Sequence, residues 1–195
     1  MEQNTIKYIP GTTIKYTPSA HDAAFSVIAP ILEAAGGLTL SQLSGITGLE
    51  GSTIQNWIKR GWVSPGKGKK YSEKQILRIL IINMLRGAMT LENIARLMTY
   101  INGDVEDTSD DIIEDIELYN CLCRIIFNAG EQEAFTPDEV NAIILTEINS
   151  LDKPVRANGE KLHKAMYVCI MAYRSAVLRS EAEAAMQGIL AEIKP

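Results

Sequence analysis

Hydrophobic residues in the first half of the chain recur every three to four positions, which is the spacing of helices that pack by one face. A first short helix is predicted before Gly48, on the apolar positions Leu40, Leu43 and Ile46. A second helix is predicted over residues 51–60, on the apolar positions Ile54, Trp57 and Ile58. Two short helices separated by a tight turn are typical of a helix-turn-helix.

Two longer helices are predicted after a turn-rich loop that carries three lysines: Lys67, Lys69 and Lys70. Ser72 and Gln75 form a capping-box pattern ahead of a strongly apolar run over residues 76–85. Thr90 caps the next predicted helix, which begins at Leu91. The pattern therefore predicts two short helices, a basic loop and two supporting helices.

The polar side of the second helix carries side chains that suit DNA. Six residues share this surface: Ser52, Thr53, Gln55, Asn56, Lys59 and Arg60. Gln55 and Asn56 can each form paired hydrogen bonds with the edge of an adenine. Lys59, Arg60 and the lysines of the loop are suited to phosphate.

This stretch resembles the MerR-type transcriptional regulators, whose typical segment is G-V-S-x-x-T-L-R-Y-Y-E-x-x-G-L-L-x-P. Eight residues fall in register with that segment without a gap: Gly48, Leu49, Thr53, Ile54, Trp57, Gly61, Val63 and Pro65. Tyr71-Ser72 and the run MTLENI at residues 89–94 match later family positions. The stretch also resembles an uncharacterised bacterial family that joins a MerR-like domain to a different C-terminal half.

The resemblance implies a winged helix-turn-helix whose recognition helix is residues 51–60 and whose wing is the lysine loop, with Tyr71 among the DNA contacts. The chain departs from the family at two places. Gln55-Asn56-Trp57 stands where the family has Arg-Tyr-Tyr. The loop before Tyr71 is shorter than the usual wing and has lysines, which are point charges, in place of bidentate arginines.

Charge is divided unevenly along the chain. The formal net charge is −5, but residues 38–100 carry +6 and residues 101–157 carry −11. DNA affinity depends on a local basic face rather than on the total. We therefore expect three regions: an N-terminal arm and helix (1–37), a MerR-like domain (38–100) and an acidic helical domain for dimerisation or effector binding (101–195).

The N-terminal region contains two near-copies, TIKYIP at residues 5–10 and TIKYTP at residues 13–18. Their β-branched residues and prolines favour an extended arm, and a small hairpin or a strand that pairs with a partner chain is the alternative. A helix is predicted over residues 19–35, capped by Ser19 and Asp22 and shortened or kinked by Pro30.

Three helices are predicted in the C-terminal region. The first covers residues 110–128, and the second begins at the pattern Thr136-Pro137-Asp138-Glu139. A loop over residues 149–158 precedes one long helix, or two nearly collinear ones, over residues 160–193. The middle of this long helix is apolar nearly all round, which predicts a central buried helix. Its alanine-rich end is expected at the solvent or at a dimer contact.

Two clusters could suggest a metal. Residues 104–117 hold eight acidic residues and no basic one, but their spacing does not match a calcium loop, so a solvated linker leading into a helix is favoured. Cys121 and Cys123 lie two apart on a predicted helix and point to different faces, which favours core positions over a shared ion. No metal and no cofactor are expected.

Enzymatic chemistry has no support in the sequence. His21 and His163 are far apart on predicted helices, and no nucleophile elbow, phosphate loop or zinc motif occurs. Trp57 and Trp62 could stack on bases, although the register of Trp57 favours core packing. The odd cysteine count and the short apolar runs predict a cytoplasmic protein without a membrane span.

The sequence thus predicts a mainly α chain, with a winged helix-turn-helix and a C-terminal helical bundle. The expected function is sequence-specific binding of double-stranded DNA in transcription control, as a homodimer, with an unidentified small-molecule or protein effector. Two alternatives stay open. One is a protein-interaction module built on the same scaffold, and the other is an architectural DNA-bending protein like the excisionases.

Overall fold

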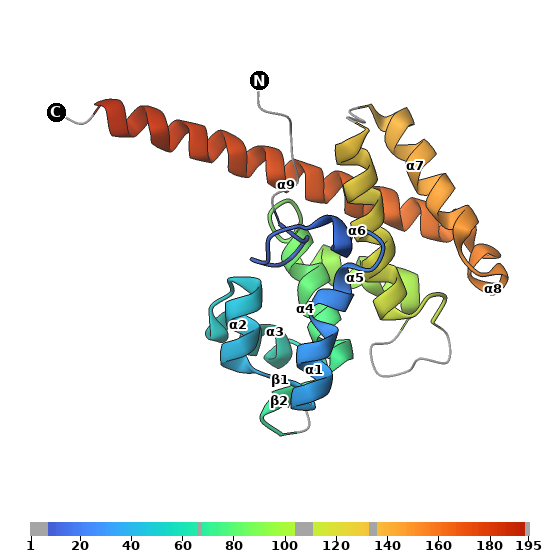
Figure 1. Cartoon of the computed structure of the whole chain (residues 1–195), viewed down its shortest axis with the longest axis horizontal. Helices are drawn as coiled ribbons and strands as arrows, with labels where there is room; N and C mark the ends of the chain where they lie inside the picture. The colour runs from blue at the N-terminus through green and yellow to red at the C-terminus, as the bar shows by residue number, and fades with distance from the viewer. Residues whose placement is uncertain (1–7, 66–67, 104–110, 133–135, 194–195) are drawn as a thin grey trace.

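The structure, a computed structural model, describes residues 8–65, 68–103, 111–132 and 136–193, and it is mainly helical, as predicted (Figure 1). The helices are α1 (Ala29–Ala35), α2 (Leu40–Thr47), α3 (Gly51–Lys59), α4 (Glu73–Leu85), α5 (Leu91–Asn102), α6 (Asp115–Glu131), α7 (Pro137–Ser150), α8 (Lys153–Arg156) and α9 (Gly159–Ile193). Strands β1 (Leu38–Thr39) and β2 (Lys70–Tyr71) pair antiparallel, with Leu38 opposite Tyr71.

Helix α4 lies at the centre of the fold and packs against α2, α5, α6 and α9. It begins at the predicted capping box, where Gln75 Oε1 accepts hydrogen bonds from the Ser72 backbone and hydroxyl. Its interior positions are buried almost without interruption: Gln75, Ile76, Leu77, Arg78, Ile79, Leu80, Ile81, Ile82, Met84 and Leu85. An apolar run of this length can be buried only where other elements cover the helix on every side.

The predicted starts of two further helices are also confirmed. Thr90 caps α5 by accepting a hydrogen bond from the Asn93 backbone (3.3 Å), and Thr136 forms a capping box with Glu139 ahead of α7. Polar side chains at these positions satisfy backbone N–H groups that have no partner within the helix.

The predicted helix over residues 19–35 is wrong in its first half. Two short 3-10 turns, Pro18–Ala20 and Ala24–Val27, precede α1, which begins only at Ala29. Proline fits only the first turn of a helix, so Pro30 fixes the start of α1 immediately before itself. Phe25 is nevertheless buried, and its backbone N–H donates to Asn120 Oδ1 of α6 (3.0 Å).

The described part of the N-terminal arm forms a small hairpin, the alternative left open by the sequence. Tyr8 and Lys15 form an antiparallel bridge, and Gly11 at the turn has φ of 77°. A Cβ atom at Gly11 would lie 2.5 Å from the Leu80 carbonyl oxygen of α4, so the turn approaches α4 too closely for any other residue. Asn83 of α4 donates to the Gly11 carbonyl oxygen (2.9 Å) and fixes the hairpin in place.

Helix α6 begins at Asp115 and not at Asp110, where the sequence predicted it. The side chain of Asn102, at the end of α5, explains the delay. Its Oδ1 accepts from the backbone N–H groups of Ile112 (3.2 Å) and Ile113 (3.3 Å), and its Nδ2 donates to the Ile113 carbonyl oxygen (2.6 Å). These bonds hold the chain in a non-helical conformation until Glu114, which precedes the helix. The first half of the acidic stretch, residues 104–110, lies outside the described residues.

The long C-terminal helix is confirmed as one continuous element, but it is not the central helix. Helix α9 packs by one face, and Val168 in its apolar middle is 41% exposed. The buried positions lie in its first half: Leu162, Ala165, Met166, Cys169, Ile170 and Ala172. The second half extends beyond the rest of the molecule (Figure 1). Short helix α8 lies within the predicted loop over residues 149–158.

Replacing Tyr119 with phenylalanine removes a buried link between the hairpin and α6, since the Tyr119 hydroxyl donates to the Pro10 carbonyl oxygen (2.8 Å). We expect the free energy of unfolding, measured by urea titration, to fall by about 1–2 kcal/mol. Tyr16→Phe is the matched control, because Tyr16 bonds Glu131 at 3.4 Å on the surface. Its loss should stay below about 0.5 kcal/mol. Equal losses would contradict the role given to the hairpin.

Candidate nucleic-acid interface

The connection between α2 and α3 is short and tightly held. Gly48 ends α2 with φ of 70°, a left-handed conformation that other residues rarely adopt. The Thr47 hydroxyl donates to the Leu43 carbonyl oxygen (2.7 Å) and accepts from the Leu49 backbone N–H (3.2 Å). Leu49 is buried. These local bonds fix the angle at which α3 leaves α2.

Helix α3 has an apolar inner side and a polar outer side. Ile54 and Trp57 are buried in the core, which confirms the prediction for Trp57. The predicted DNA-contacting residues lie on the outer side, five of them exposed and Thr53 half-buried: Ser52, Thr53, Gln55, Asn56, Lys59 and Arg60. The structure therefore brings all six candidates of this helix onto one surface.

The paired strands β1 and β2 lie beside this surface. A shallow open groove is lined by Gln55 and Ile58 of α3 and by Lys69, Lys70 and Tyr71 of the loop and β2. Lys69 is exposed, whereas Tyr71 is half-buried and burial raises its pKa. Lys67 lies outside the described residues. The groove places amide and ammonium groups from two elements side by side.

Lys70 has a structural contact that the sequence did not predict. Its ammonium group donates to the carbonyl oxygen of Ala35, the last residue of α1. A cation at a helix C-terminus interacts favourably with the carbonyl groups there. Lys70 is exposed as well, so its charge lies at the surface while the hydrogen bond ties β2 to α1.

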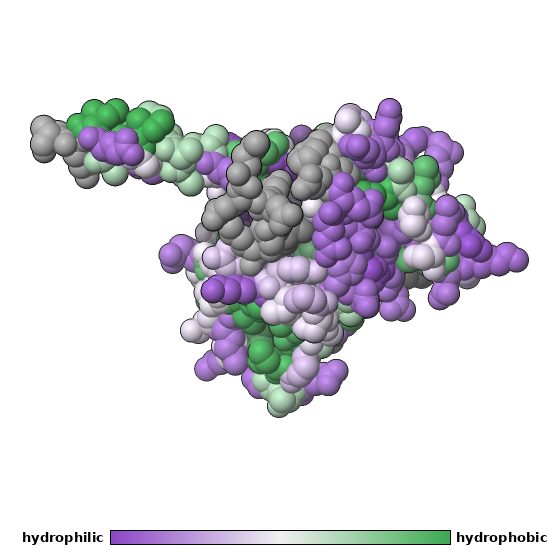
Figure 2. Space-filling view, turned by 45° about the horizontal axis from the view of Figure 1, so that its top comes forward, coloured by the Kyte–Doolittle hydropathy of each residue, from purple (hydrophilic) through white to green (hydrophobic). Residues whose placement is uncertain are grey.

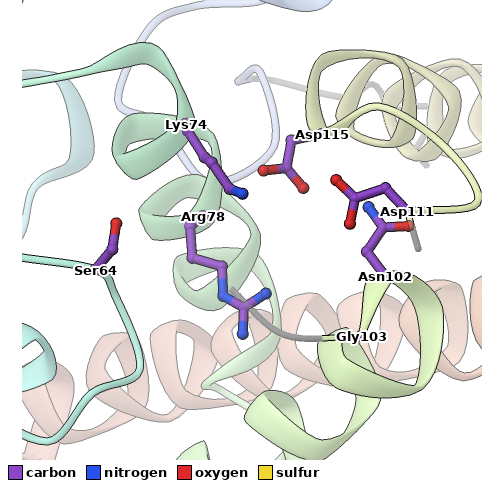
Figure 3. Close-up of a pocket in the computed structure, with 7 residues that line it drawn as sticks. All are labelled: Ser64, Lys74, Arg78, Asn102, Gly103, Asp111 and Asp115. Carbon is purple, nitrogen blue, oxygen red and sulfur yellow. The ribbon is translucent and has the colours of Figure 1, made fainter. Parts of the chain in front are cut away.

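A second polar cluster lies where α4, the end of α5 and the start of α6 meet (Figure 3). Lys74 extends from α4 toward Asp115, whereas the guanidinium of Arg78, one turn further along α4, points away from the two aspartates. Burial lowers the pKa of Arg78, and the two aspartates oppose this shift. The cluster encloses a cavity of about 10 Å³, room for one water molecule at most, and is therefore no site for an effector.

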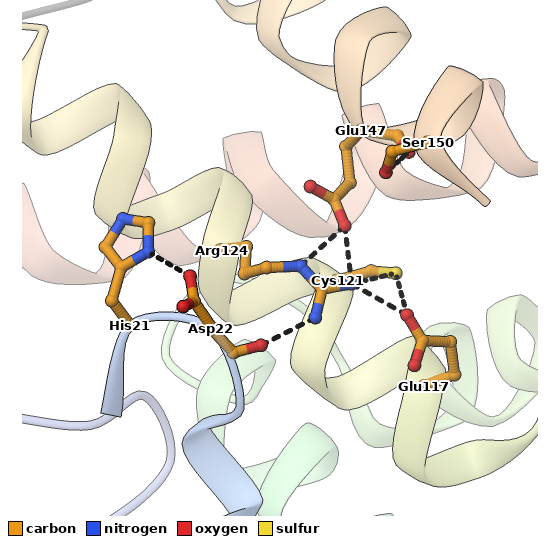
Figure 4. Close-up of polar contacts among 7 residues, drawn as sticks. All are labelled: His21, Asp22, Glu117, Cys121, Arg124, Glu147 and Ser150. Atoms are coloured by element: carbon orange, nitrogen blue, oxygen red, sulfur yellow. Dashed lines mark hydrogen bonds and ion pairs between the residues drawn. The ribbon is translucent and has the colours of Figure 1, made fainter. Parts of the chain in front are cut away.

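A third cluster surrounds Arg124 of α6 (Figure 4). Its guanidinium lies 2.7 Å from Glu117 and 2.6 Å from Glu147 of α7, and it donates to the Asp22 carbonyl oxygen at 2.7 Å. Burial lowers the pKa of Arg124, but its hydrogen bonds with Glu147 and Glu117 outweigh this effect and raise it. One side chain thus joins α6, α7 and the N-terminal segment.

The same cluster also contains three side chains of the kinds that bind metal ions. Oxygen and sulfur atoms of Glu117, Cys121 and Glu147 lie within 4.8 Å of one another. The Arg124 guanidinium lies among them, 3.2 Å from the Cys121 sulfur, and already supplies the positive charge. Burial raises the pKa of Cys121, so its thiol stays protonated at neutral pH, whereas metals bind thiolates.

The three cysteines are free and buried, which confirms the predicted core positions of Cys121 and Cys123. Burial raises the pKa of Cys123 and raises the pKa of Cys169 to about 12. Neutral, water-excluded thiols of this kind behave as small apolar side chains.

Sequence reasoning missed the roles of Arg78, Arg124 and Asn83. Each is a polar residue within an apolar stretch, which is a signal that the sequence does contain. A charged or amide group in such a stretch must find partners when it is buried. The sequence could therefore have predicted that these side chains form hydrogen bonds. It could not have predicted their partners, which lie in distant segments.

The fold and the site define a mainly helical protein with an exposed polar helix beside a basic pair of short strands. Residues 32–122 match a protein-family model described as "Domain of unknown function (DUF1836)". The matched range contains every candidate residue of α3, the lysine loop and β2, and ends within α6. It excludes Arg124 and Glu147.

The chain is also similar to a curated protein, "Uncharacterized protein YkrK" of Bacillus subtilis (strain 168). The two are 30% identical over 135 residues, which are 67% of this chain and 57% of the relative. The chain thus spans little more than half the length of that relative. No solved structure gives a significant match. Among the helices of the described residues, none combines the length and apolarity needed to cross a membrane.

Replacing Arg124 with methionine should leave Glu147 buried without its partner. We expect the free energy of unfolding to fall by about 2–4 kcal/mol, because an unpaired buried charge is strongly destabilising. The matched control is Arg96→Met, which breaks a surface pair with Glu92 at a similar distance, 2.7 Å. That change should cost less than about 0.5 kcal/mol. Equal losses, or one tightly bound zinc per wild-type chain, would contradict this assignment of the cluster.

Proposed function

We propose that this protein is a sequence-specific DNA-binding transcriptional regulator with a MerR-like winged helix-turn-helix. In this proposal α2 and α3 form the helix-turn-helix, and the paired strands with the lysine loop form the wing. Helix α3 enters the major groove, which admits one α-helix. Gln55 and Asn56 contact base edges, while Lys59, Arg60 and the wing lysines bind phosphates.

The observation that carries this proposal is the outer face of α3. Six side chains able to contact DNA lie there together, above a core fixed by Ile54 and Trp57. A surface of amides, hydroxyls and cations without a carboxylate suits DNA better than an acidic or apolar ligand. The +6 charge of residues 38–100 supports the same partner.

A homodimer is part of the proposal, and the projecting half of α9 supports it. Large apolar side chains there are between 43% and 67% exposed: Leu178, Met186, Ile189, Leu190 and Ile193. They recur at helical spacing and gather on the projecting end (Figure 2). Their exposed area is on the order of 500 Å² per chain, so two copies would bury about 1,000 Å², near the lower limit for a specific interface.

The proposal excludes catalysis and a bound cofactor. The alternatives are a protein-interaction module on the same scaffold and an architectural, excisionase-like DNA-binding protein. DNA bending would also use the cationic residues of α3, but it would not require base contacts from Gln55 and Asn56. An effector is expected to be a protein or a small molecule that acts outside the cavity between α4 and α6.

The double variant Gln55→Ala,Asn56→Ala separates base contacts from phosphate contacts. The variant should bind the sites that the wild type selects from random duplexes about 1–3 kcal/mol more weakly for each side-chain amide removed. Its affinity for random DNA should change little. Fluorescence anisotropy against both duplexes measures this difference. Equal losses on both from a folded variant would favour the architectural alternative. Absence of wild-type binding at low salt would favour the protein-interaction module.

The phosphate contacts have a separate signature. Lys59→Ala,Lys69→Ala should weaken binding to both duplexes alike and reduce the slope of log affinity against log salt by up to about 2 units. Lys153→Ala removes one positive charge from α8, far from α3 (Figure 1), and is the control that should change neither quantity.

The dimer can be tested on α9 without disturbing the core. Light scattering should give about 43 kDa for the wild type, twice the chain mass of 21.5 kDa. Ile189→Glu,Ile193→Glu should give the monomer mass, because charges on the apolar face oppose its burial. Ala184→Glu,Ala191→Glu adds the same charges to the opposite face of the helix and should leave the dimer intact. A wild-type monomer would remove the dimer from the proposal.

A further inference from the structure

Arg60 and Trp62 form a pair at the C-terminal end of α3. The Arg60 guanidinium lies over the Trp62 indole ring, 5.3 Å from its centroid. Arg60 is exposed, and no carboxylate among the described residues pairs with it. An arginine over an aromatic face is attracted by the electron-rich ring while the edges of its guanidinium stay free. The pair therefore holds a cation at the surface without neutralising it.

The local backbone places Trp62 beside Arg60. Gly61 has φ of 74°, which glycine adopts without strain. The Trp62 backbone N–H donates to the Trp57 carbonyl oxygen (3.0 Å), and the Gly61 N–H donates to the Ile58 carbonyl oxygen (2.9 Å). These two bonds are the Schellman pattern of a helix end. The chain turns back at Gly61, and the indole comes to lie next to Arg60, the residue that directly follows α3.

The interior of the fold holds Trp62 from the other side. Arg78 of α4 is 7% exposed, and its Nε donates to the Trp62 carbonyl oxygen at 3.2 Å. Trp62 itself is half-buried against the core. Both backbone polar groups of Trp62 are therefore bonded, one to α3 and one to α4, and the half-buried side chain packs against the core.

The position of Arg60 along α3 indicates what it would bind. Arg60 follows Asn56 by four residues, which places it about 6 Å further along the helix axis on the same outer side. The major groove is about 12 Å wide, so a helix with Asn56 at the bases carries Arg60 toward the backbone. A guanidinium edge can bind two phosphate oxygens at once, which a lysine cannot.

We propose that Trp62 is a positioning residue that holds Arg60 ready to bind a DNA phosphate at the end of the recognition helix. This inference rests on the proposed function. A free arginine side chain loses much rotamer freedom when it binds, and an indole that already fixes the guanidinium reduces that loss. Lys59, the neighbouring cation on α3, shows no such contact in the described structure and serves as the internal comparison.

The test is a cycle of four proteins: wild type, Trp62→Leu, Arg60→Ala and the double variant. Each is titrated against a random-sequence duplex over a series of salt concentrations, with thermal unfolding as the check on folding. Trp62→Leu should weaken binding roughly two- to fivefold and leave the salt slope unchanged, since the phosphate contact is kept. Arg60→Ala should lower the salt slope by about 1 unit.

The coupling between the two residues decides the outcome. In the Arg60→Ala protein, Trp62→Leu should cost no further affinity. Trp62→Phe keeps an aromatic face and should recover most of the wild-type affinity, and it replaces Trp62→Leu if that variant is unfolded. Equal losses from Trp62→Leu with and without Arg60 would show direct contact by the indole and overturn the inference. So would wild-type affinity in folded Trp62→Leu. If the wild type itself binds no duplex, the proposed function fails and the inference fails with it.

Discussion

The burial of α4 is the constraint on which the rest of the structure depends. Its apolar side chains need cover on all sides, and α2, α5, α6 and α9 provide it. The same helix carries Arg78 into the interior, where a charge is costly unless it is bonded. Arg78 meets this requirement by donating to the Trp62 carbonyl oxygen, and the negative charges of Asp115 and Asp111 favour its charged form. The polar interactions of this one buried arginine thus link the segment after α3 and the start of α6 to α4.

This arrangement changes the meaning of the charge distribution. The +6 of residues 38–100 overstates the charge available to DNA, because Asp111 and Asp115 from the acidic region lie beside Lys74 and Arg78. Lys70 is also bonded, to the end of α1. Among the described cations on α3, at its C-terminal end and in the neighbouring loop, Lys59, Arg60 and Lys69 have no hydrogen bond or ion pair of this kind. The proposed DNA binding would therefore depend on the positions of these three cations rather than on the regional total.

The sequence predicted the elements whose signals are local. The capping boxes at Ser72 and Thr136 and the glycine at residue 48 each act within a few residues, and all lie at the predicted helix ends. The polar face of α3 followed from periodicity in the same way. The late start of α6 depends on Asn102, and the place of the N-terminal hairpin depends on Asn83 and Tyr119. Such partners are distant in sequence, so no local pattern contains them.

The projecting half of α9 connects assembly to the candidate DNA surface through one close approach. A Cβ atom at Gly87, in the turn between α4 and α5, would lie 2.8 Å from the Cβ of Ala176. Glycine and alanine at these positions let α9 lie directly on that turn. The direction in which α9 leaves the fold at Ala176 is therefore set by its contact with the end of α4. Since α4 also fixes the end of α3 through Arg78, two copies joined by α9 would hold their α3 helices at a set separation. The spacing of the DNA half-sites would then be a property of the core rather than of a flexible linker.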